Sequence, residues 1–537
     1  MVGIPGRSGG CATCRRKKKG CDKKVPFCGQ CIKAGLVCEG YGGRRPTIWI
    51  NATDGENHSY TALHTRSSET PAITLHGSLV RSARENRYVG LYLTAFLPNG
   101  RLFSRDAAWI SSAGWLRYYE SLCRSEKTLQ LITLAHGLSM LATRDNDSQL
   151  KLKGFQAHRM ALQEMRVGLQ DPQRSTGDGL LAAVRLFRFY EILYGAESSE
   201  PRRANPVPQV EGYYAHTDGE MALFMNRGYD KKWSEAGRYL LASGRIVSFI
   251  LGVGRRKHSP FSDIKWVTEP WKDTKKSPLE QLTDIMVQTP GLLEELDTIR
   301  ASPVAERSPH AWNDLHVKCY HIEQALIAWK MAMKKDLQIY DYTSSGDGNT
   351  LPIPQIDRDY ALLHLSFFYW GCSILLYTTI HMAATEADRD QLPITRPSPI
   401  PFSSHGHPNY QDERNPTLHA HRIIHAIPLS YSPHAGGYAA LSSTFPLGIA
   451  RRYLLVAHCF PHEGGSQGML QEDLQEMLSQ PFMAAYSARF IDHLHKVDTP
   501  AQSLKDLTGW RGMELRSMRW WFGPAVEEYG YSVLEVA

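Results

Sequence analysis

The chain has 537 residues, a formal net charge of +7 and ten cysteines. This length exceeds what one hydrophobic core organises, so a single small domain is excluded and two or three domains are expected. The first residues carry no apolar segment of the kind that directs secretion, so we expect a reducing compartment, which argues against a fold held by disulfides.

The positive charge lies at the amino-terminal end. Residues 1–50 contain eleven Lys and Arg but only two acidic residues, a net charge of +9, so the other 487 residues sum to −2. A local excess of this kind is the electrostatic footprint of a nucleic-acid-binding segment rather than of a generally basic surface. Binding through it would depend steeply on salt.

Six of the ten cysteines fall between Cys11 and Cys38, as two copies of the spacing C-x2-C-x6-C separated by six residues. A segment this short has too few apolar residues to form a core. In a reducing compartment, thiolates at C-x2-C spacing are metal ligands, and zinc is the usual ion of an all-sulfur site. One zinc would leave two cysteines unused, whereas six thiolates satisfy two zinc ions if two of them bridge. A disulfide framework is the alternative, and it needs an oxidising compartment.

Three features of this segment resemble the fungal binuclear zinc-cluster (Zn₂Cys₆) transcription factors. They are the complete spacing C-x2-C-x6-C-x6-C-x2-C-x6-C, the basic run between the second and third cysteines, and Pro26 two residues before the fourth. Gly20 departs from the family, whose members often carry Lys or Arg there. The resemblance implies two zinc ions per chain, with Cys11 and Cys28 bridging them, Cys14 and Cys21 completing one site, and Cys31 and Cys38 completing the other.

The basic run indicates how DNA would be contacted. In a helix beginning near Cys14, the side chains of Arg15, Lys18 and Lys19 would share one face. Such a helix fits the major groove, where lysine binds the O6 and N7 acceptors of guanine. The resemblance implies a CGG triplet as the target, with Lys18 as the base reader. Its implied phosphate contacts are Arg15, Lys17, Lys19 and Lys23. A nuclear-import signal is a compatible second use of the run.

Along the sequence, composition and turn signals predict that the chain has four parts. Residues 1–10 are expected to be a disordered arm, 11–40 the zinc-binding DNA-binding domain, 41–80 a linker rich in turn residues, and 81–537 a large domain. Between Cys38 and Arg101 no apolar heptads occur, so the short dimerising coiled coil of many zinc-cluster factors is not expected. Whether the chain forms a homodimer is left open.

The large domain reads as all-α. Apolar residues recur at helical spacing over four segments, 126–143, 150–169, 178–195 and 313–334. A fifth such segment covers 469–496, and Asp178 is interpreted as a helix N-cap. Strand signals are limited to 47–50. The expected fold is therefore a zinc-stapled module with two short helices, followed by an all-α regulatory domain.

Three stretches of the large domain resemble the second type of fungal-specific transcription-factor domain. They are residues 161–172, the apolar segment 178–195, and an H-x2-G…L…R-G pattern that begins at His216. The resemblance implies a regulatory role without common catalytic residues. Arg185 and Arg188 are unusual charges on the apolar segment, and His216 is interpreted as a packed structural histidine.

Two further patterns are weighed and set aside. The 26 residues between Asp359 and Glu386 lack Lys, Arg, Asp and Glu, which is long enough to span a bilayer. Their polar residues and mixed flanks favour a helix buried in the domain, so no membrane contact is expected. His419, His421 and His425 contain an i, i+4 pair, but no acidic ligand accompanies it.

These observations predict a zinc-dependent, sequence-specific DNA-binding transcription factor. It would act in the nucleus on RNA polymerase II genes, with double-stranded DNA and the transcription machinery as partners, and it would not be an enzyme. The alternative is an α-helical interaction scaffold, or an enzyme, with a zinc knob that binds no specific DNA.

Overall fold

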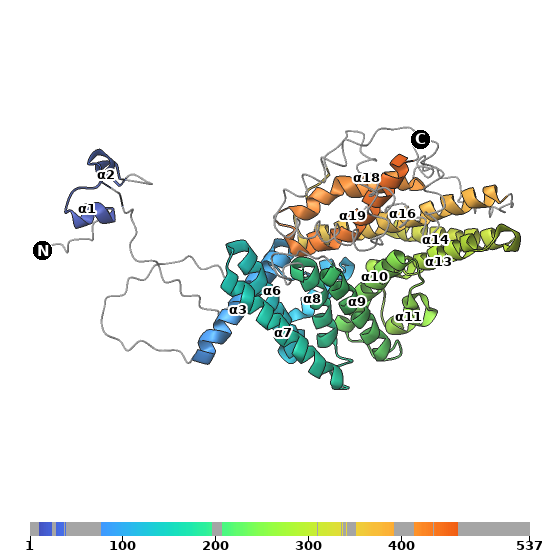
Figure 1. Ribbon diagram of the computed structural model, residues 1–537, viewed down its shortest axis with the longest axis horizontal. Helices are drawn as coiled ribbons and strands as arrows, with labels where there is room; N and C mark the ends of the chain where they lie inside the picture. Colours follow the sequence, from blue (N-terminus) through green and yellow to red (C-terminus); the bar gives the residue numbers. More distant parts are fainter. Residues whose placement is uncertain are drawn as a thin grey trace. The chain divides into compact units, whose positions relative to one another are not determined.

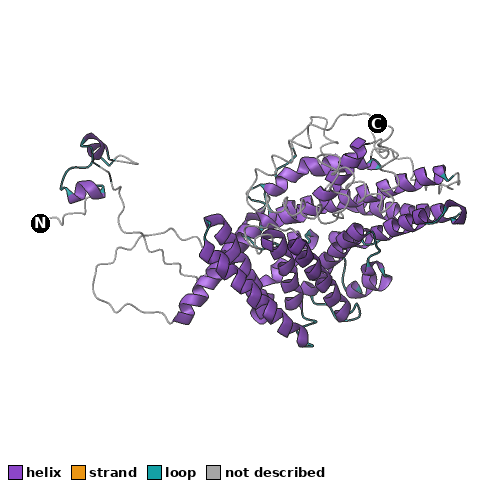
Figure 2. Ribbon diagram, in the orientation of Figure 1, coloured by secondary structure: helices purple, strands orange, loops and turns teal. Residues whose placement is uncertain are grey.

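The computed structural model describes residues 10–23, 28–36, 38, 77–195, 207–308, 310–333, 336, 340, 351–390, 413–432 and 434–459. The chain divides into two compact units, 1–76 and 77–537. Both are helical, and no strand occurs among the residues that the model describes (Figures 1 and 2). The predicted fold class, a small cysteine module and a large all-α body, is confirmed. The segments 47–50 and 469–496 lie outside the described residues.

The amino-terminal unit contains two helices of five residues each, α1 (Ala12–Arg16) and α2 (Gly29–Lys33). Its buried cluster consists of cysteines, and among the described residues of this unit Leu36 is the one other hydrophobic side chain packed against them. Helices this short are not stable by themselves, because the cost of forming the first turn is recovered only over longer helices. The cysteines must therefore supply the energy that holds this unit together.

The carboxyl-terminal unit is built from longer helices. They are α3 (Gly77–Phe96), α4 (Arg105–Ile110), α5 (Tyr119–Ser125), α6 (Lys127–Asp145), α7 (Ser148–Gln170), α8 (Asp178–Tyr194), α9 (Val207–Arg227), α10 (Glu235–Arg255), α11 (Ile264–Thr268), α12 (Pro278–Met286), α13 (Thr289–Ala301), α14 (Ala311–Met333), α16 (Asp357–Arg389), α18 (Pro416–Ala426) and α19 (Gly436–Cys459). The four described segments that the periodicity predicted are α6, α7, α8 and α14. Their ends agree with the predicted ends to within two residues, which is the usual uncertainty of helix boundaries.

The capping prediction for α8 is wrong by one residue. The N-cap is Gly177, and Asp178 is the first helical residue. The Asp178 carboxylate is turned to other partners, because it accepts hydrogen bonds from Arg227 and Ser234. A carboxylate at this position still lies favourably against the amino-terminal end of the helix dipole.

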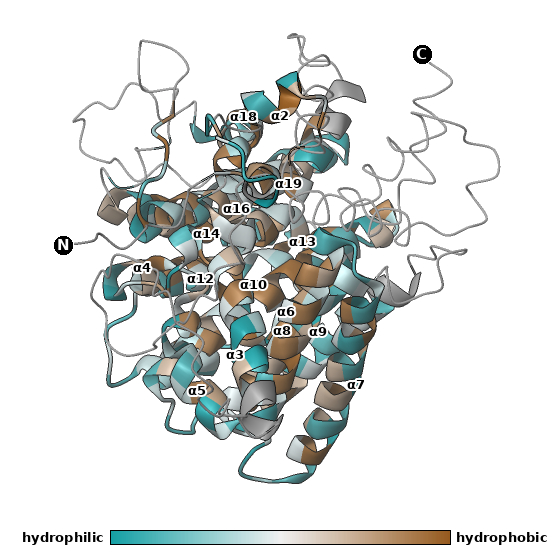
Figure 3. Ribbon diagram, turned by 90° about the vertical axis from the view of Figure 1, so that its left-hand side faces the viewer, coloured by the Kyte–Doolittle hydropathy of each residue, from teal (hydrophilic) through white to brown (hydrophobic). Residues whose placement is uncertain are grey.

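Most of the core of this unit forms one continuous cluster of buried residues from α3 to α19, and Tyr360, Ala435 and Ala439 form a small second cluster. Hydrophobic residues lie along α6, α8 and α10 (brown in Figure 3). Two helices, α10 and α16, are long and apolar enough to cross a membrane, but 89% and 94% of their most apolar windows are buried inside the protein. A helix that is hydrophobic on all sides belongs in a core. The prediction that the uncharged segment after Asp359 is a buried helix is thus confirmed.

Candidate metal centre and DNA interface

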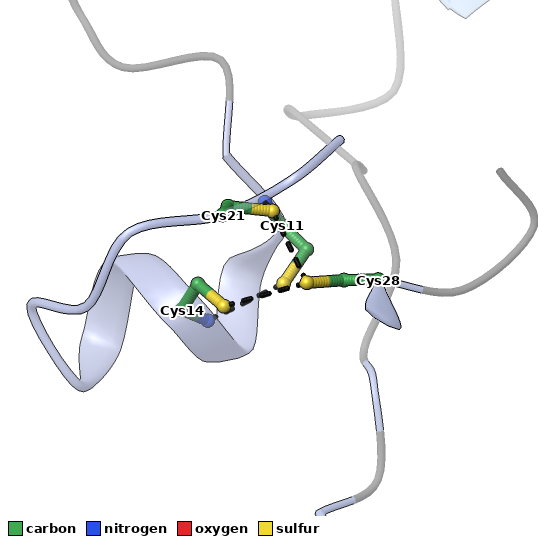
Figure 4. A group of neighbouring side chains, drawn as sticks. All are labelled: Cys11, Cys14, Cys21 and Cys28. Carbon is green, nitrogen blue, oxygen red and sulfur yellow. Dashed lines mark hydrogen bonds between the residues drawn. The ribbon is translucent and has the colours of Figure 1, made fainter. Parts of the chain in front are cut away.

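The six cysteine sulfurs of the amino-terminal unit converge. The sulfurs of Cys11, Cys14, Cys21 and Cys28 all lie within 4.8 Å of one another (Figure 4), and those of Cys11, Cys31 and Cys38 form a second such group. Cys11 belongs to both groups. The structure therefore brings together all the residues that the spacing identified as metal ligands.

The distances between sulfurs distinguish a metal site from a disulfide. The Sγ–Sγ distance is 3.7 Å for Cys14–Cys28, for Cys14–Cys31 and for Cys11–Cys31, and 3.4 Å for Cys21–Cys28. A disulfide needs about 2.05 Å. The edge of a sulfur tetrahedron around zinc, with bonds of about 2.3 Å, is about 3.8 Å. The cysteines are free thiols at the spacing of a zinc centre, and the disulfide alternative does not hold.

Backbone amides support the sulfurs. The N–H of Cys14 donates to Cys11 Sγ over 3.3 Å, and the N–H of Cys11 donates to Cys21 Sγ over 3.3 Å. In the second half, the N–H of Cys28 donates to Cys38 Sγ over 3.4 Å. Hydrogen bonds to a sulfur favour its ionised form, which is the form that binds metal.

Burial disfavours the ionised form of three of these thiols. Burial raises the pKa of Cys11 and Cys14 above the ordinary thiol range, and it raises the pKa of Cys31 to about 12. A coordinating zinc ion supplies the positive charge that deprotonates such thiols. The donor set and its spacing thus fit two divalent zinc ions, which would leave six thiolates with a charge of −2 beside the lysine run.

Asp22 connects the two halves of the module. Its carboxylate accepts a hydrogen bond of 3.0 Å from the N–H of Gly29, the first residue of α2. The sequence reasoning missed this contact. An acidic residue directly after Cys21 in an otherwise basic segment was the available signal, because carboxylates favour helix amino termini.

The basic run does not form the helix that the sequence predicted. Helix α1 begins at Ala12, before Cys14, and ends at Arg16. The N–H of Lys17 donates to Thr13 O over 3.1 Å, and the N–H of Lys19 donates to Cys14 O over 3.0 Å, while Lys18 has a φ of 51°. The first of these bonds is the last i to i−4 bond of the helix, and the second, together with the left-handed Lys18, is the 6→1 bond of a Schellman-type helix end. The expectation that Arg15, Lys18 and Lys19 share a helical face is therefore wrong, because the chain leaves the helix at Lys17.

The lysines expected to contact DNA are nevertheless exposed, and three of them are consecutive in one turn. Lys17, Lys18 and Lys19 form the exposed turn at the end of α1, and Lys23 is exposed beyond Cys21. The side chain of Arg15 lies outside the described residues. Cations at the carboxyl end of a helix complement its dipole, so this turn is a favourable place to concentrate positive charge.

The histidines singled out in the large domain are packed among other groups. His216 stacks on Phe187, with ring centroids 5.2 Å apart, and its Nε2 lies 3.7 Å from Glu191 Oε1. His158, Glu191 and His216 lie within 4.8 Å of one another, a grouping the sequence did not suggest. His419 is buried and its Nε2 lies 2.8 Å from the Glu413 carbonyl oxygen, so it is held by the backbone.

Residues 9–47 match the family model described as the fungal Zn(2)-Cys(6) binuclear cluster domain. This segment of the amino-terminal unit is thus a Zn₂Cys₆ zinc-cluster DNA-binding domain, and its six cysteines are those of a binuclear cluster consistent with two zinc ions. No curated protein and no solved structure matches the chain.

A domain of this family implies a DNA-binding transcription factor that functions in the nucleus, and proteins of the family are typically not enzymes. No match identifies the second type of fungal-specific transcription-factor domain in the large unit. The resemblance of residues 81–537 to that domain stays a prediction.

Proposed function

We propose that the protein is a sequence-specific transcription factor of RNA polymerase II genes that reads a CGG-like triplet through Lys18. The observation that carries the proposal is the backbone of Lys18. This residue has a left-handed conformation at the exposed end of α1. Non-glycine residues rarely adopt that conformation, which costs roughly 1 kcal/mol, and such positions cluster at functional sites.

The neighbouring cations complete the interface. Lys17 and Lys19 flank the base reader in the same exposed turn, and Lys23 follows Cys21. These lysines, with Arg15, would contact phosphates on either side of the triplet. Such contacts set the position of the module on the duplex and give the salt dependence, whereas the base contact gives the sequence preference.

We further propose the ligand scheme in which Cys11 and Cys28 bridge two zinc ions. Cys14 and Cys21 complete one site, and Cys31 and Cys38 the other. Cys11 lies in both sulfur groups, which supports its bridging role. Cys28 contacts the sulfurs of Cys14 and Cys21, and its N–H donates to Cys38 Sγ, which supports a place between the two metals.

The remaining parts of the proposal concern partners and organisation. The chain would consist of an arm at 1–10, the cluster domain at 11–40, a linker at 41–80 and a regulatory domain at 81–537. The regulatory domain would work with the transcription machinery. The absence of apolar heptads in the linker sequence supports binding by a single chain, or pairing through the helical body, over pairing through a coiled coil.

Two measurements test the function. Zinc analysis of the purified full chain should give two ions per chain, and the variant His216→Gln should also give two, because the group around His216 is a separate potential site. Fluorescence anisotropy with a CGG-containing and a scrambled duplex, at two salt concentrations, should show a preference for CGG and weaker binding at the higher salt. Equal affinity for both duplexes would favour the scaffold or enzyme alternative.

A further inference from the structure

A cavity of about 490 Å³ lies inside the helical body, between α8, α9, α10 and α19. Small-molecule sites in proteins typically have volumes of about 300–1,000 Å³. At the carboxyl end of α10 the cavity reaches exposed Gly254 and Arg255, and its other walls include buried Arg188 and Tyr438. It is therefore large enough for a ligand and has an edge through which one can enter.

The walls are mainly apolar. The aliphatic and aromatic side chains that line the cavity include Ile192, Ile246, Ile250, Leu251, Phe445 and Ile449. The hydroxyl groups of Ser112 and Tyr438, both buried, are hydrogen-bonded to each other in the same wall. A cavity of this composition suits a ligand with an apolar body and one polar end.

The polar end is indicated by a charge imbalance behind the wall. Arg185 Nε donates to Glu220 Oε1 over 2.8 Å, and Arg188 Nη1 donates to Glu220 Oε2 over 3.2 Å. The side chains of Arg185, Arg188 and Glu220 are 1%, 7% and 0% exposed. Two guanidinium groups thus share one carboxylate, and the buried triad has a net charge of +1.

Nothing in the described part of the chain neutralises this charge. Neither Arg185 nor Arg188 pairs with a second carboxylate there, and Arg185 Nη1 has no hydrogen-bond partner. Burial lowers the pKa of Arg185, and the neighbouring Arg188 lowers it further while Glu220 opposes the change. A buried charge without a counter-charge is unfavourable, so an anion beside Arg188 would stabilise the fold.

We propose that this cavity binds a small amphipathic monocarboxylate, whose carboxylate pairs with Arg188 and whose apolar body lies along α10 and α19. One negative charge matches the net charge of +1 on the triad of Arg185, Arg188 and Glu220, and the Ser112–Tyr438 hydroxyl pair offers further polar contacts. The helical body would then be a ligand-binding unit. This inference goes beyond the proposed DNA-binding function and does not rest on it.

A series of ligands with one apolar body and three head groups tests the charge requirement. Isothermal titration of the full chain would use decanoate, decan-1-ol and decyltrimethylammonium, each below its micelle concentration. We expect decanoate to bind at least tenfold more tightly than decan-1-ol, and the cation not to bind. Equal binding of decanoate and decan-1-ol, or no binding of decanoate up to its solubility limit, would overturn the proposal.

Two variants locate the site. Arg188→Met should reduce the preference for decanoate over decan-1-ol to less than twofold, while Arg144→Met, at an exposed pair with Asp145, should leave it unchanged. Gly254→Trp should weaken decanoate at least tenfold, because the side chain would enter open space at the cavity edge.

The ligand-free melting temperature separates a binding role from a structural one. Arg188→Met leaves Arg185 and Glu220 as a balanced pair, so the melting temperature should be unchanged or higher. A lower melting temperature together with a retained preference for decanoate would show that Arg188 is only structural. Because these experiments need no DNA, their failure would leave the proposed DNA-binding function untouched.

Discussion

Lys18 and Gly35 occupy equivalent positions in the two halves of the zinc-cluster module, 17 residues apart. Both have left-handed backbones, with φ values of 51° and 62°. The Lys19 N–H to Cys14 O bond in the first half has its counterpart in the Leu36 N–H to Cys31 O bond of the second. One half thus ends its helix with glycine, the favoured residue for this conformation, and the other half ends with lysine.

Replacing Lys18 with glycine should separate the effect of its left-handed backbone from the effect of its side chain on base recognition. We expect Lys18→Gly to leave the zinc content unchanged and to relieve roughly 1 kcal/mol of backbone strain. It should remove about 1–3 kcal/mol of discrimination between CGG and scrambled duplexes. Anisotropy titrations at fixed salt measure the discrimination.

Lys23→Gly is the matched control, because Lys23 also has a left-handed backbone, with a φ of 56°. Because Lys23 is proposed to contact a phosphate, losing its side chain should weaken binding to all sequences alike. It should also lower the slope of log K against log salt by about one. If the two glycine variants lost specificity equally, the assignment of base reading to Lys18 would be wrong.

Removing a bridging cysteine should be more damaging than removing a terminal one. Cys28→Ala would take a ligand from both zinc ions, and zinc binding supplies folding energy on the order of 10 kcal/mol in zinc-finger peptides. We expect loss of both ions and of DNA binding, whereas Cys38→Ala should retain part of the zinc. A Cys28→Ala protein with two zinc ions and normal affinity would contradict the bridging scheme.

Glu220→Gln should strongly destabilise the helical body. It would leave Arg185 and Arg188 together in the core without a carboxylate, and breaking a buried ion pair on one side typically costs about 3–5 kcal/mol. Urea unfolding followed by helical circular dichroism measures the change. Asp145→Asn, at an exposed pair with Arg144, is the control and should change the stability by less than about 1 kcal/mol.

The helical body should lose stability as the pH falls from about 6.5 towards 5. Burial lowers the pKa of His136 to about 3, and it lowers those of His364 and His419 to about 4. In the unfolded chain these histidines bind protons below about pH 6.5, while in the fold they stay neutral. The unfolded state therefore gains protons first, and each histidine removes up to about 1.4 kcal/mol of stability per pH unit.

Denaturation at pH 7, 6 and 5 measures this dependence. The variant His364→Leu should lower the number of protons taken up on unfolding by about one. If the slope of the unfolding free energy against pH is the same in the variant, His364 titrates alike in the folded and unfolded chains.

The sequence was most informative where chemistry alone fixes the structure. The six metal ligands could be identified from spacing because zinc requires thiolates at set intervals, and α8 could be identified because its apolar residues recur with a helical period. The end of α1 could not. Arg15 to Lys19 are all good helix formers, and the helix end at Lys18 depends on the bond from the Lys19 N–H to Cys14 O, which local propensity does not reveal.

The electrostatics of the core were also beyond sequence reasoning. Arg185 and Arg188 were recognisable as unusual charges on an apolar helix. Their shared partner, Glu220, comes from α9, more than 30 residues further along the chain. Such pairing is set by how α8 and α9 pack, which periodicity within one helix does not determine.

The two halves of the zinc module repeat a backbone but not a charge pattern. At the positions equivalent to Arg15 to Lys19, the second half carries one basic residue, Lys33. Because the basic residues are concentrated in one half, we expect the module to bind the duplex in one orientation. If the module reads a CGG-like triplet as proposed, an inverted triplet could be read only by turning the whole module over, so the direction of each triplet would give the direction in which its bound chain faces.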